Sequence, residues 1–246
     1  MRNVWVIARR EYNRFFSTSV SYAVAFAILL IVGLIFALTL LFANGAGGST
    51  APDIKGVTWW FTFLLVLTVP ALTMRLISDE NRMGTLELLL TAPLRDWELI
   101  VGKWLGGFMF ILSVLAVTLI YPFILNLLET PGIDQGQMMS AYLGIILVSA
   151  AFLALGVGVS SLFNNQVAAF ITTLGLFMVL WFMFGFMSQI LPTGASDIVT
   201  YLDMGAHFSN NLNAGIINLS DIVYYLSITA LGLFTGTVAV EVRRWN

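Results

Sequence analysis

The chain has 246 residues, of which 59% are hydrophobic and 10% charged, whereas a soluble domain carries about 25% charged residues. So few charges cannot cover an apolar core with a wettable surface, which excludes a water-soluble globular protein and indicates an integral membrane protein. The net charge of -2 excludes a basic face for nucleic acid, and the absence of cysteine excludes disulfides and thiolate chemistry.

The first 17 residues are amphipathic. They combine four arginines with aromatic residues such as Trp5 and Tyr12. This pattern is typical of a helix that lies in the membrane interface with its rings among the lipid headgroups. We therefore expect an interfacial helix over residues 1–17, with a simple positively charged anchor as the alternative.

Six apolar runs are each long enough to cross about 30 Å of hydrocarbon as a helix, which takes about 20 residues. Each is also about twice as long as a barrel strand needs to be. The expected spans cover residues 20–43, 58–78, 99–125, 139–163, 167–191 and 222–241. The predicted fold is an all-α integral membrane protein with six transmembrane helices in a single domain, residues 1–246.

Charged residues are missing from the middle of all six runs. Ion-coupled carriers and proton relays usually need such residues at mid-depth, so both functions lose weight. Arg75, Glu98, Lys103 and Glu241 lie near the ends of runs, where we expect long side chains to reach the headgroups.

Small residues cluster in the fourth run, at Gly156, Gly158, Ser160 and Ser161. They resemble a catalytic nucleophile turn only loosely, and no partner base accompanies them. Close helix packing in lipid is the better interpretation, because small side chains let two helices approach each other.

Basic residues are distributed unevenly between the loops. Every lysine and arginine except Lys55 lies before the first span, around the link between spans two and three, or after the sixth span. Because basic residues are retained on the cytoplasmic side, we expect both termini and the link at 79–98 to be cytoplasmic. The loops near 44–57, 126–138 and 192–221 then face outward.

The link between spans two and three belongs to a charged, amphipathic stretch, residues 75–103. Gly84 breaks the chain direction, Thr85 can cap a helix, and the helix must stop before Pro93. We expect a short helix at about 84–92, too short to be stable without a packing partner. That partner is either lipid and the protein's own bundle or a groove in a soluble subunit, and spacing leaves both open.

The segment at 192–221 is long for a connection and partly apolar, so we expect it to contain helices. Ile198, Tyr201 and Leu202 follow helical spacing. His207, Asn210, Asn211 and Asn213 are expected to meet water, with the lining of an exit pathway as the alternative.

The chain lacks a G-x-x-x-x-G-K-[ST] loop for nucleotide phosphates and an H-E-x-x-H pair for zinc. We therefore expect no catalytic residue, no metal site and no bound cofactor, so the chain is not an enzyme by itself. Any nucleotide energy must come from another polypeptide.

A family resemblance rests on the link and its surroundings. Residues Glu80, Gly84, Thr85, Leu86, Glu87, Leu88, Leu89, Pro93, Gly102 and Lys103 follow the pattern E-x3-GTLE-LL-x3-P…GK. This pattern resembles the signature of ABC transporter permeases of the ABC-2 type, and the resemblance extends over nearly the whole chain. The ending from Gly215 to Trp245 is most similar to gliding-motility and copper-enzyme-maturation permeases. Ser19 departs from that branch, which often has proline there.

The resemblance implies a cytoplasmic coupling helix at 84–92, short outer re-entrant helices before span six, and a multi-pass protein of a prokaryotic plasma (inner) membrane. It also implies two copies of a cytoplasmic ABC ATPase, which bind ATP and Mg, and a second permease chain in a homodimer or related heterodimer within the membrane lipids. The implied ATPase contacts are Glu80, Gly84, Thr85, Glu87, Leu88, Leu89 and Pro93.

Three function classes follow from these observations. The first is a permease subunit that exports an amphipathic or lipid-like substrate, coupled to a separate ATPase. The second is an ATPase-coupled membrane adaptor that transmits force or signal to an outer partner without moving a solute. The third is a channel or ion-coupled carrier, which the charge-free spans disfavour. Abundant methionine and phenylalanine suit a lipid-like cargo, but they also fill any membrane core.

Overall fold

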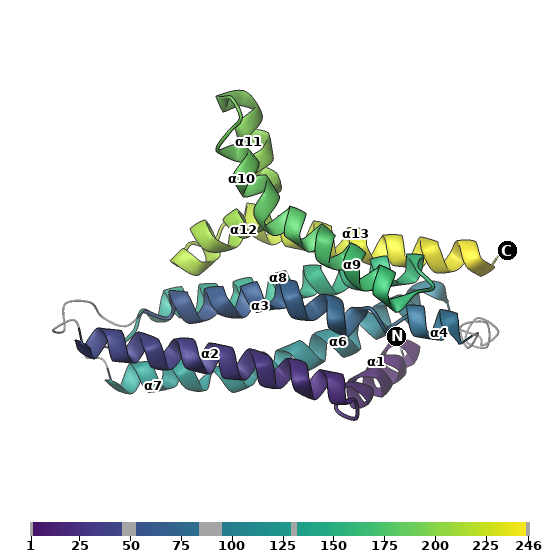
Figure 1. Ribbon diagram of the computed structural model, residues 1–246, viewed down its shortest axis with the longest axis horizontal. Coiled ribbons are helices and arrows are strands. Elements are labelled where there is room, and N and C mark those ends of the chain that lie inside the picture. Colours follow the sequence, from purple (N-terminus) through teal and green to yellow (C-terminus); the bar gives the residue numbers. More distant parts are fainter. Residues whose placement is uncertain (1, 46–52, 84–94, 129–131, 245–246) are drawn as a thin grey trace.

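The computed structural model describes residues 2–45, 53–83, 95–128 and 132–244, and the regular elements within these ranges are helices (Figure 1). The long helices run roughly side by side along one axis. α1 (Arg2–Phe15), α4 (Ser78–Arg82) and the last turn of α13 (Leu219–Arg244) lie at the same end of this bundle, which we call the termini end.

Within the described ranges, six helical segments are long and apolar enough to cross a membrane. They are Ser19–Phe42, Lys55–Glu80, Asp96–Leu128, Gln135–Leu162, Gln166–Ser188 and Leu219–Arg243. Each overlaps one of the apolar runs found in the sequence, so the prediction of an all-α protein with six candidate spans is confirmed.

The first three segments show how local sequence shapes the helices. α2 (Ser19–Gly45) is continuous, whereas α3 (Lys55–Thr73) is followed by a turn and then by α4. The third segment is divided into α6 (Asp96–Thr118) and α7 (Ile120–Leu128). Pro122 explains this division, because its ring lacks an N–H and would clash with the carbonyl of Thr118 four residues earlier.

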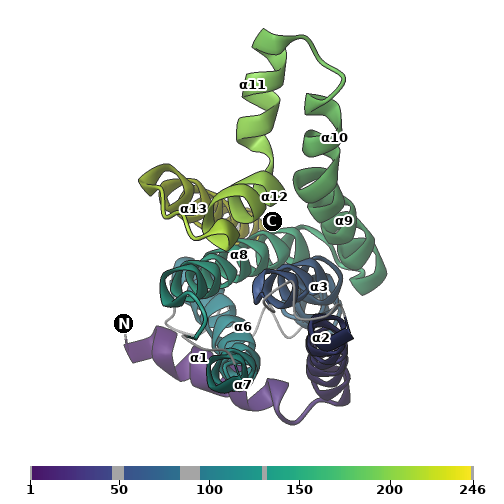
Figure 2. The ribbon, with the colours of Figure 1, turned by 90° about the vertical axis from the view of Figure 1, so that its left-hand side faces the viewer.

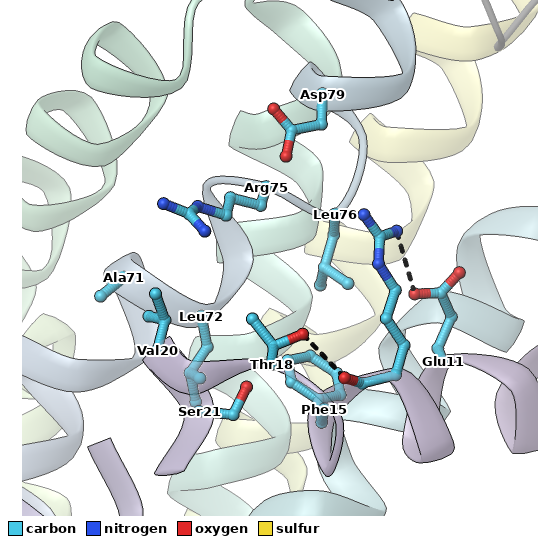
Figure 3. A pocket seen from close by; sticks show the side chains of 11 residues that line it. Glu11, Phe15, Thr18, Val20, Ser21, Ala71, Leu72, Arg75, Leu76 and Asp79 are labelled. Atoms are coloured by element: carbon cyan, nitrogen blue, oxygen red, sulfur yellow. Dashed lines mark hydrogen bonds and ion pairs between the residues drawn. The ribbon is translucent and has the colours of Figure 1, made fainter. Parts of the chain in front are cut away.

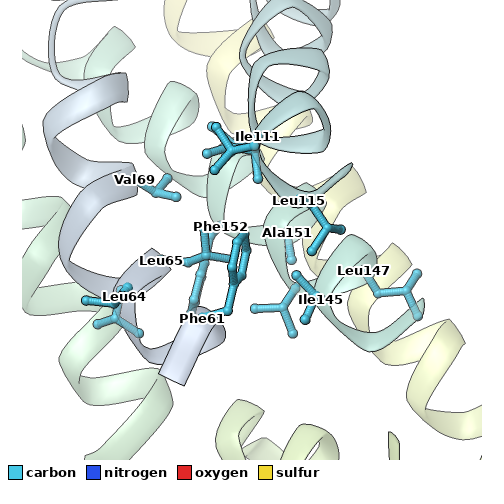
Figure 4. Packing of buried hydrophobic residues seen from close by; sticks show 14 of the residues in the cluster. Phe61, Leu64, Leu65, Val69, Ile111, Leu115, Ile145, Leu147, Ala151 and Phe152 are labelled. Carbon is cyan, nitrogen blue, oxygen red and sulfur yellow. The ribbon is translucent and has the colours of Figure 1, made fainter. Parts of the chain in front are cut away.

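α8 (Gln135–Leu162) is the central helix and is buried along most of its length. Asp134 caps its start by accepting hydrogen bonds from the N–H groups of Gly136 and Gln137. Figure 4 shows the apolar core, where Phe61 and Leu65 of α3 and Ile111 of α6 meet Phe152 of α8. The core therefore joins α3, α6 and α8.

Small residues bring α8 and α13 into backbone contact. A Cβ atom on Gly232 would lie 2.5 Å from the carbonyl carbon of Ala154, and one on Gly158 would lie 2.7 Å from the carbonyl oxygen of Gly232. Any larger side chain would force the helices apart. The sequence prediction of a small-residue packing face in the fourth run is thus confirmed for Gly158.

The fifth segment bends away from the bundle. α9 (Gln166–Met178) continues through a π-helical turn, η1 (Val179–Met183), into α10 (Phe184–Ser188). α11 (Thr193–Leu202) then packs beside α10, and the two stand away from the other helices (Figure 2). Phe186, Ile190 and Ile198 in this region are exposed.

The chain returns to the bundle through α12 (Met204–Ala206), the π-helical η2 (His207–Asn211) and the 3-10 helix η3 (Leu212–Ala214). Of these short elements, η2 and η3 pack against α8 and α12 packs against η1, and α13 follows them. The predicted helical content of 192–221 is present, and η2 and η3 are folded onto α8 instead of forming an open loop.

Candidate functional site

A buried lysine connects three helices at the termini end. The side chain of Lys103, in the second turn of α6, is 0% exposed. Its Nζ donates to Oε1 of Glu80 at 2.7 Å, to Oε1 of Glu11 at 3.3 Å and to the carbonyl oxygen of Leu76 at 2.7 Å. We call Lys103, Glu11 and Glu80 the ion cluster. A buried charge is tolerated only when it is paired and hydrogen-bonded, and all three donors of this ammonium are used.

Glu11 is the α1 member of the ion cluster, and two further arginines surround it. The Arg10 guanidinium lies 2.9 Å from Oε1 of Glu11, and that of Arg14 lies 3.8 Å from Oε2. Burial by itself raises the pKa of Glu11, but the charges of Lys103, Arg10 and Arg14 outweigh it and hold that pKa below its ordinary value. Glu11 is therefore an anion in the folded protein.

Two glycines seat α1 against α6. A Cβ atom on Gly106 would lie 2.7 Å from Cβ of Glu11, and one on Gly102 would lie 2.7 Å from Cβ of Ile7. Their four-residue spacing places both on one face of α6. This close approach lets the short Glu11 side chain reach Lys103, so the glycines belong to the architecture of the ion cluster.

The beginning of α6 is tied to α1 by a second contact. Oε2 of Glu98 accepts a hydrogen bond from the side-chain amide of Asn3 at 3.1 Å and another from the backbone N–H of Arg95 at 3.2 Å. The second bond satisfies an N–H group that the helix itself leaves without a partner. α1 therefore contacts α6 at its first turn and again at Lys103.

The turn between α3 and α4 is held by α8. The backbone N–H groups of Ile77 and Ser78 both donate to Oγ of Ser160 at 3.3 Å. Ser160 is one of the small residues that the sequence assigns to helix packing, and it has this additional role. These bonds fix the start of α4 and so position Glu80 for its contact with Lys103.

Together these contacts fix both ends of the segment that contains the predicted coupling helix. Glu80 lies four residues before position 84 and is anchored by Lys103, while Arg95 directly follows the segment and is anchored through Glu98. Gly84, Thr85, Glu87, Leu88, Leu89 and Pro93 lie outside the described residues, as does the predicted helix at 84–92. Glu80 is 6% exposed.

Two sequence expectations are wrong at this end. Glu98 and Lys103 were expected to extend toward the headgroups, but both are buried, because α1 covers the start of α6 and supplies their partners. Sequence reasoning missed the pairing of Glu11 with Lys103. The available signals were an acidic residue in the arginine-rich first helix and the glycine spacing around Lys103.

A second buried polar cluster lies at the opposite end of the bundle. Nδ1 of His207 lies 2.6 Å from Oδ1 of Asp221, and Nε2 lies 2.9 Å from the carbonyl oxygen of Tyr201. The His207 ring stacks on Tyr224 at a centroid distance of 4.2 Å. Asn211 donates to the same Asp221 oxygen at 3.2 Å. This cluster joins η2 to the start of α13.

The expectation that the polar residues of this segment meet water is wrong for His207 and Asn213, which are 8% and 5% exposed. Asn213 accepts from Oγ1 of Thr58 at 2.6 Å and donates to the carbonyl oxygen of Lys55 at 3.1 Å. Both residues thus fasten the short helices to long ones. A spacing pattern cannot reveal this, because the partners on the long helices, Asp221 for His207 and Thr58 for Asn213, lie 14 and 155 residues away.

Asp203 is a further buried carboxyl at this end. Burial raises its pKa, against hydrogen bonds from the backbone N–H groups of Ala206 and Gly205. It accepts from the Gly205 N–H at 2.8 Å and so caps α12. Its role is structural.

Within the described part of the chain, no group of three or more His, Asp or Glu residues is arranged to hold a metal ion. The ion cluster instead links three helices, α1, α4 and α6, through the ammonium group of Lys103.

Comparison with known proteins identifies the family of this chain. The family model described as "ABC-2 family transporter protein" matches residues 43–240. The chain is 29% identical over 199 residues to the "Probable ABC transporter permease protein NosY" of Pseudomonas aeruginosa, covering 74% of this chain and 66% of that protein. It is 30% identical over 199 residues to the protein of the same name from Stutzerimonas stutzeri, covering 75% of this chain and 67% of that protein.

The chain thus spans about two thirds of the length of these curated relatives. The family model covers well over half of the chain, including four of the six candidate spans in full, most of the sixth, and the segment between Met83 and Arg95. The chain belongs to the ABC-2 family of transporter membrane proteins.

Proposed function

We propose that this chain is the permease subunit of an ATP-driven transporter and that residues 84–92 form the coupling helix that contacts a separate cytoplasmic ATPase. The observation that carries the proposal is the ion cluster. It ties Glu80, four residues before this segment, to α1 and α6. A displacement of the segment by the ATPase would therefore be transmitted to the spanning helix α6. ATP and Mg are bound by the ATPase.

The buried position of Glu80 gives it a different role from the residues that follow it. Glu80 is paired with Lys103 and holds the start of the segment in place. Glu87 and Thr85 then supply polar contacts to the ATPase, Leu88 and Leu89 are buried against it, and Gly84 and Pro93 set the helix ends. A short helix that packs into a groove of its partner obtains the stabilisation that it lacks alone.

The orientation of the chain follows from its basic residues. In the described part, Lys55 is the one lysine or arginine that lies away from the termini end, and the others, such as Arg14 and Arg243, lie there. The positive-inside rule places that end in the cytoplasm of a prokaryotic cell, with the protein in the plasma membrane. α1 then lies in the inner interface, with Trp5 54% exposed toward the headgroups.

The proposal also includes a second permease chain, identical or related, and an ATPase in two copies. The region of α10 and α11 supports a partner chain, because these helices stand away from their own bundle and expose Phe186, Ile190 and Ile198. The spans lack charges at mid-depth, which suits export of an amphipathic or lipid-like substrate better than that of an ion. The outer helices between Thr193 and Ala214 would close the exit.

The test is purification of the chain from its native membrane in mild detergent, followed by identification of bound proteins and an assay of ATP hydrolysis. The Glu87→Arg variant reverses the charge at the proposed contact. Glu241→Arg makes the same change on the exposed end of α13 and serves as the matched control. We expect an ATPase to co-purify with the wild type and the control and to be lost from Glu87→Arg.

A chain that purifies alone would contradict the proposal. An ATPase that binds Glu87→Arg as well as the wild type would remove this residue from the interface. An ATPase complex that moves no cargo after reconstitution would favour the adaptor function, in which the force reaches an outer partner instead.

A further inference from the structure

A small cavity opens at the termini end between α1, α2 and the turn after α3 (Figure 3). Its volume is about 90 Å³, enough for about six water molecules. Apolar side chains, among them Phe15 and Leu72, form its floor, whereas Arg14, Arg75 and Asp79 line it with charges. It is distinct from the ion cluster, although Glu11 borders both.

The charges that line this cavity are available to a ligand. Arg75 and Asp79 form no ion pair or side-chain hydrogen bond with any other residue that the structure describes. Arg14 is 46% exposed, and its guanidinium lies 3.8 Å from Oε2 of Glu11, beyond hydrogen-bond distance. The acidic charge of Glu11 is already balanced by Lys103 and Arg10. Two cations, Arg14 and Arg75, and one anion, Asp79, are therefore available to a ligand in this cavity.

The hydroxyl of Ser21 adds a polar group to the cavity. Ser21 is 3% exposed and lines the cavity. Its hydroxyl makes no hydrogen bond within the described ranges, whereas the neighbouring Thr18 hydroxyl is satisfied by the carbonyl oxygen of Arg14 at 2.8 Å. This hydroxyl is accessible from the cavity and can both donate and accept, so it is suited to a polar ligand.

An apolar track leads away from the cavity along α2. Tyr22, Phe26 and Leu30 are 57%, 67% and 50% exposed, and their four-residue spacing puts them on one face of the helix. This face starts four residues after Thr18, which lines the cavity and whose carbonyl oxygen accepts from the N–H of Tyr22. A ligand with a polar head in the cavity and a hydrocarbon tail on this face would match both surfaces.

We propose that the cavity binds the headgroup of an aminophospholipid, with the phosphate between Arg14 and Arg75 and the primary ammonium on Asp79. Guanidinium groups recognise phosphate through paired, charge-assisted hydrogen bonds. A primary ammonium can donate to the Asp79 carboxylate, whereas a choline headgroup has no N–H to donate and a glycerol headgroup has no positive charge. The acyl chains lie along Tyr22 and Phe26.

This inference depends on the proposed orientation in the membrane but not on the ATPase or on transport. The test is native mass spectrometry of the delipidated full chain, titrated with phosphatidylethanolamine, phosphatidylglycerol and phosphatidylcholine of equal acyl chains. We expect the ethanolamine lipid to bind most tightly. Arg75→Gln should weaken it about tenfold, as loss of a charge-assisted hydrogen bond predicts, and Arg75→Lys should weaken it less.

Arg9→Gln is the matched control, because Arg9 is an exposed arginine of α1 outside the cavity, and it should bind like the wild type. Asp79→Asn should retain the phosphate contacts but lose the preference for ethanolamine over glycerol. Equal binding of the three lipids, or equal effects of Arg75→Gln and Arg9→Gln, would overturn the proposal. Competition by soluble glycerophosphoethanolamine at the same concentration as the lipid would show a site for free phosphate compounds and would overturn the lipid assignment.

Discussion

Replacing Lys103 by methionine is the perturbation to which the ion cluster should be most sensitive. The substitution keeps an unbranched side chain of similar length but removes the ammonium group. Oε1 of Glu80 and Oε1 of Glu11 then lose contacts of 2.7 and 3.3 Å, and the carbonyl oxygen of Leu76 loses one of 2.7 Å. The two carboxylates remain buried.

The loss of unfolding free energy depends on which contacts of the two carboxylates remain in Lys103→Met. Removing one partner of a buried ion pair costs about 3–5 kcal/mol, because the remaining charge is left uncompensated. Arg10 stays 2.9 Å from Glu11 and 3.7 Å from Glu80 and compensates part of this loss. We therefore expect Lys103→Met to lower the free energy of unfolding by about 3 kcal/mol, the low end of that range.

The assay is reversible unfolding of the purified chain in mixed micelles, with a double-mutant cycle. Adding Glu80→Gln to Lys103→Met removes a buried charge that has lost its lysine contact, so it should restore about 1 kcal/mol or more. Lys55→Met is the control, since Lys55 is 49% exposed and its contact with Asp53 is 3.6 Å long. A surface pair of this kind contributes about 0–1 kcal/mol.

Two results would refute this reasoning. Lys103→Met could cost no more than Lys55→Met, which would mean that the ammonium is not a buried partner of the two carboxylates. Alternatively, Glu80→Gln could be as destabilising in the Lys103→Met background as in the wild type. The two residues would then act independently.

Three further outcomes are expected. Gly232→Ala should lower the free energy of unfolding by about 1–3 kcal/mol, measured in the same micelles, because its Cβ would meet the α8 backbone at 2.5 Å, whereas Gly175→Ala, with nothing within 4 Å, should be neutral or stabilising. The pKa of Glu11 is lowered in the folded state from an ordinary value of 4.5, so its ionised form contributes stability above that pH, and this is lost as the pH falls through the folded-state pKa. The stability difference between wild type and Glu11→Gln, followed by unfolding at stepwise lower pH, should therefore shrink under acid; a constant difference would contradict the assignment. His207→Phe should cost about 1–3 kcal/mol, and less when combined with Asp221→Leu, because the single change removes the 2.6 Å contact of a buried carboxylate and leaves it the longer bond from Asn211; additive costs would argue against coupling.

The helices could be predicted from sequence because each is specified locally. A run of about 20 apolar residues crosses a bilayer only as a helix, and six such runs are present. The π-helical η1 and the departure of α10 and α11 from the bundle could not be predicted in this way. They depend on packing between elements, such as the contact of Phe152 in α8 with Trp181 in η1 at a centroid distance of 5.8 Å.

In the candidate site, too, the features specified locally could be predicted from sequence, and those that depend on tertiary packing could not. The importance of the link between spans two and three could be inferred from its charges and its resemblance to a family signature. The ion cluster could not, because Glu11 and Lys103 are 92 residues apart and meet only when α1 docks on α6. Position near the end of a span suggested headgroup contact for Lys103, and tertiary packing overrode it.

The most direct test of the central claim is site-specific crosslinking of the proposed coupling helix in native membranes. The chain contains no cysteine, so a single one can be introduced without background. We predict that Glu87→Cys, labelled with a benzophenone maleimide and irradiated, forms a covalent product with an ATPase chain, and that Ile217→Cys, exposed before α13 at the opposite end, does not. A chain that gives no ATPase product from position 87, or gives it equally from position 217, would contradict the coupling function.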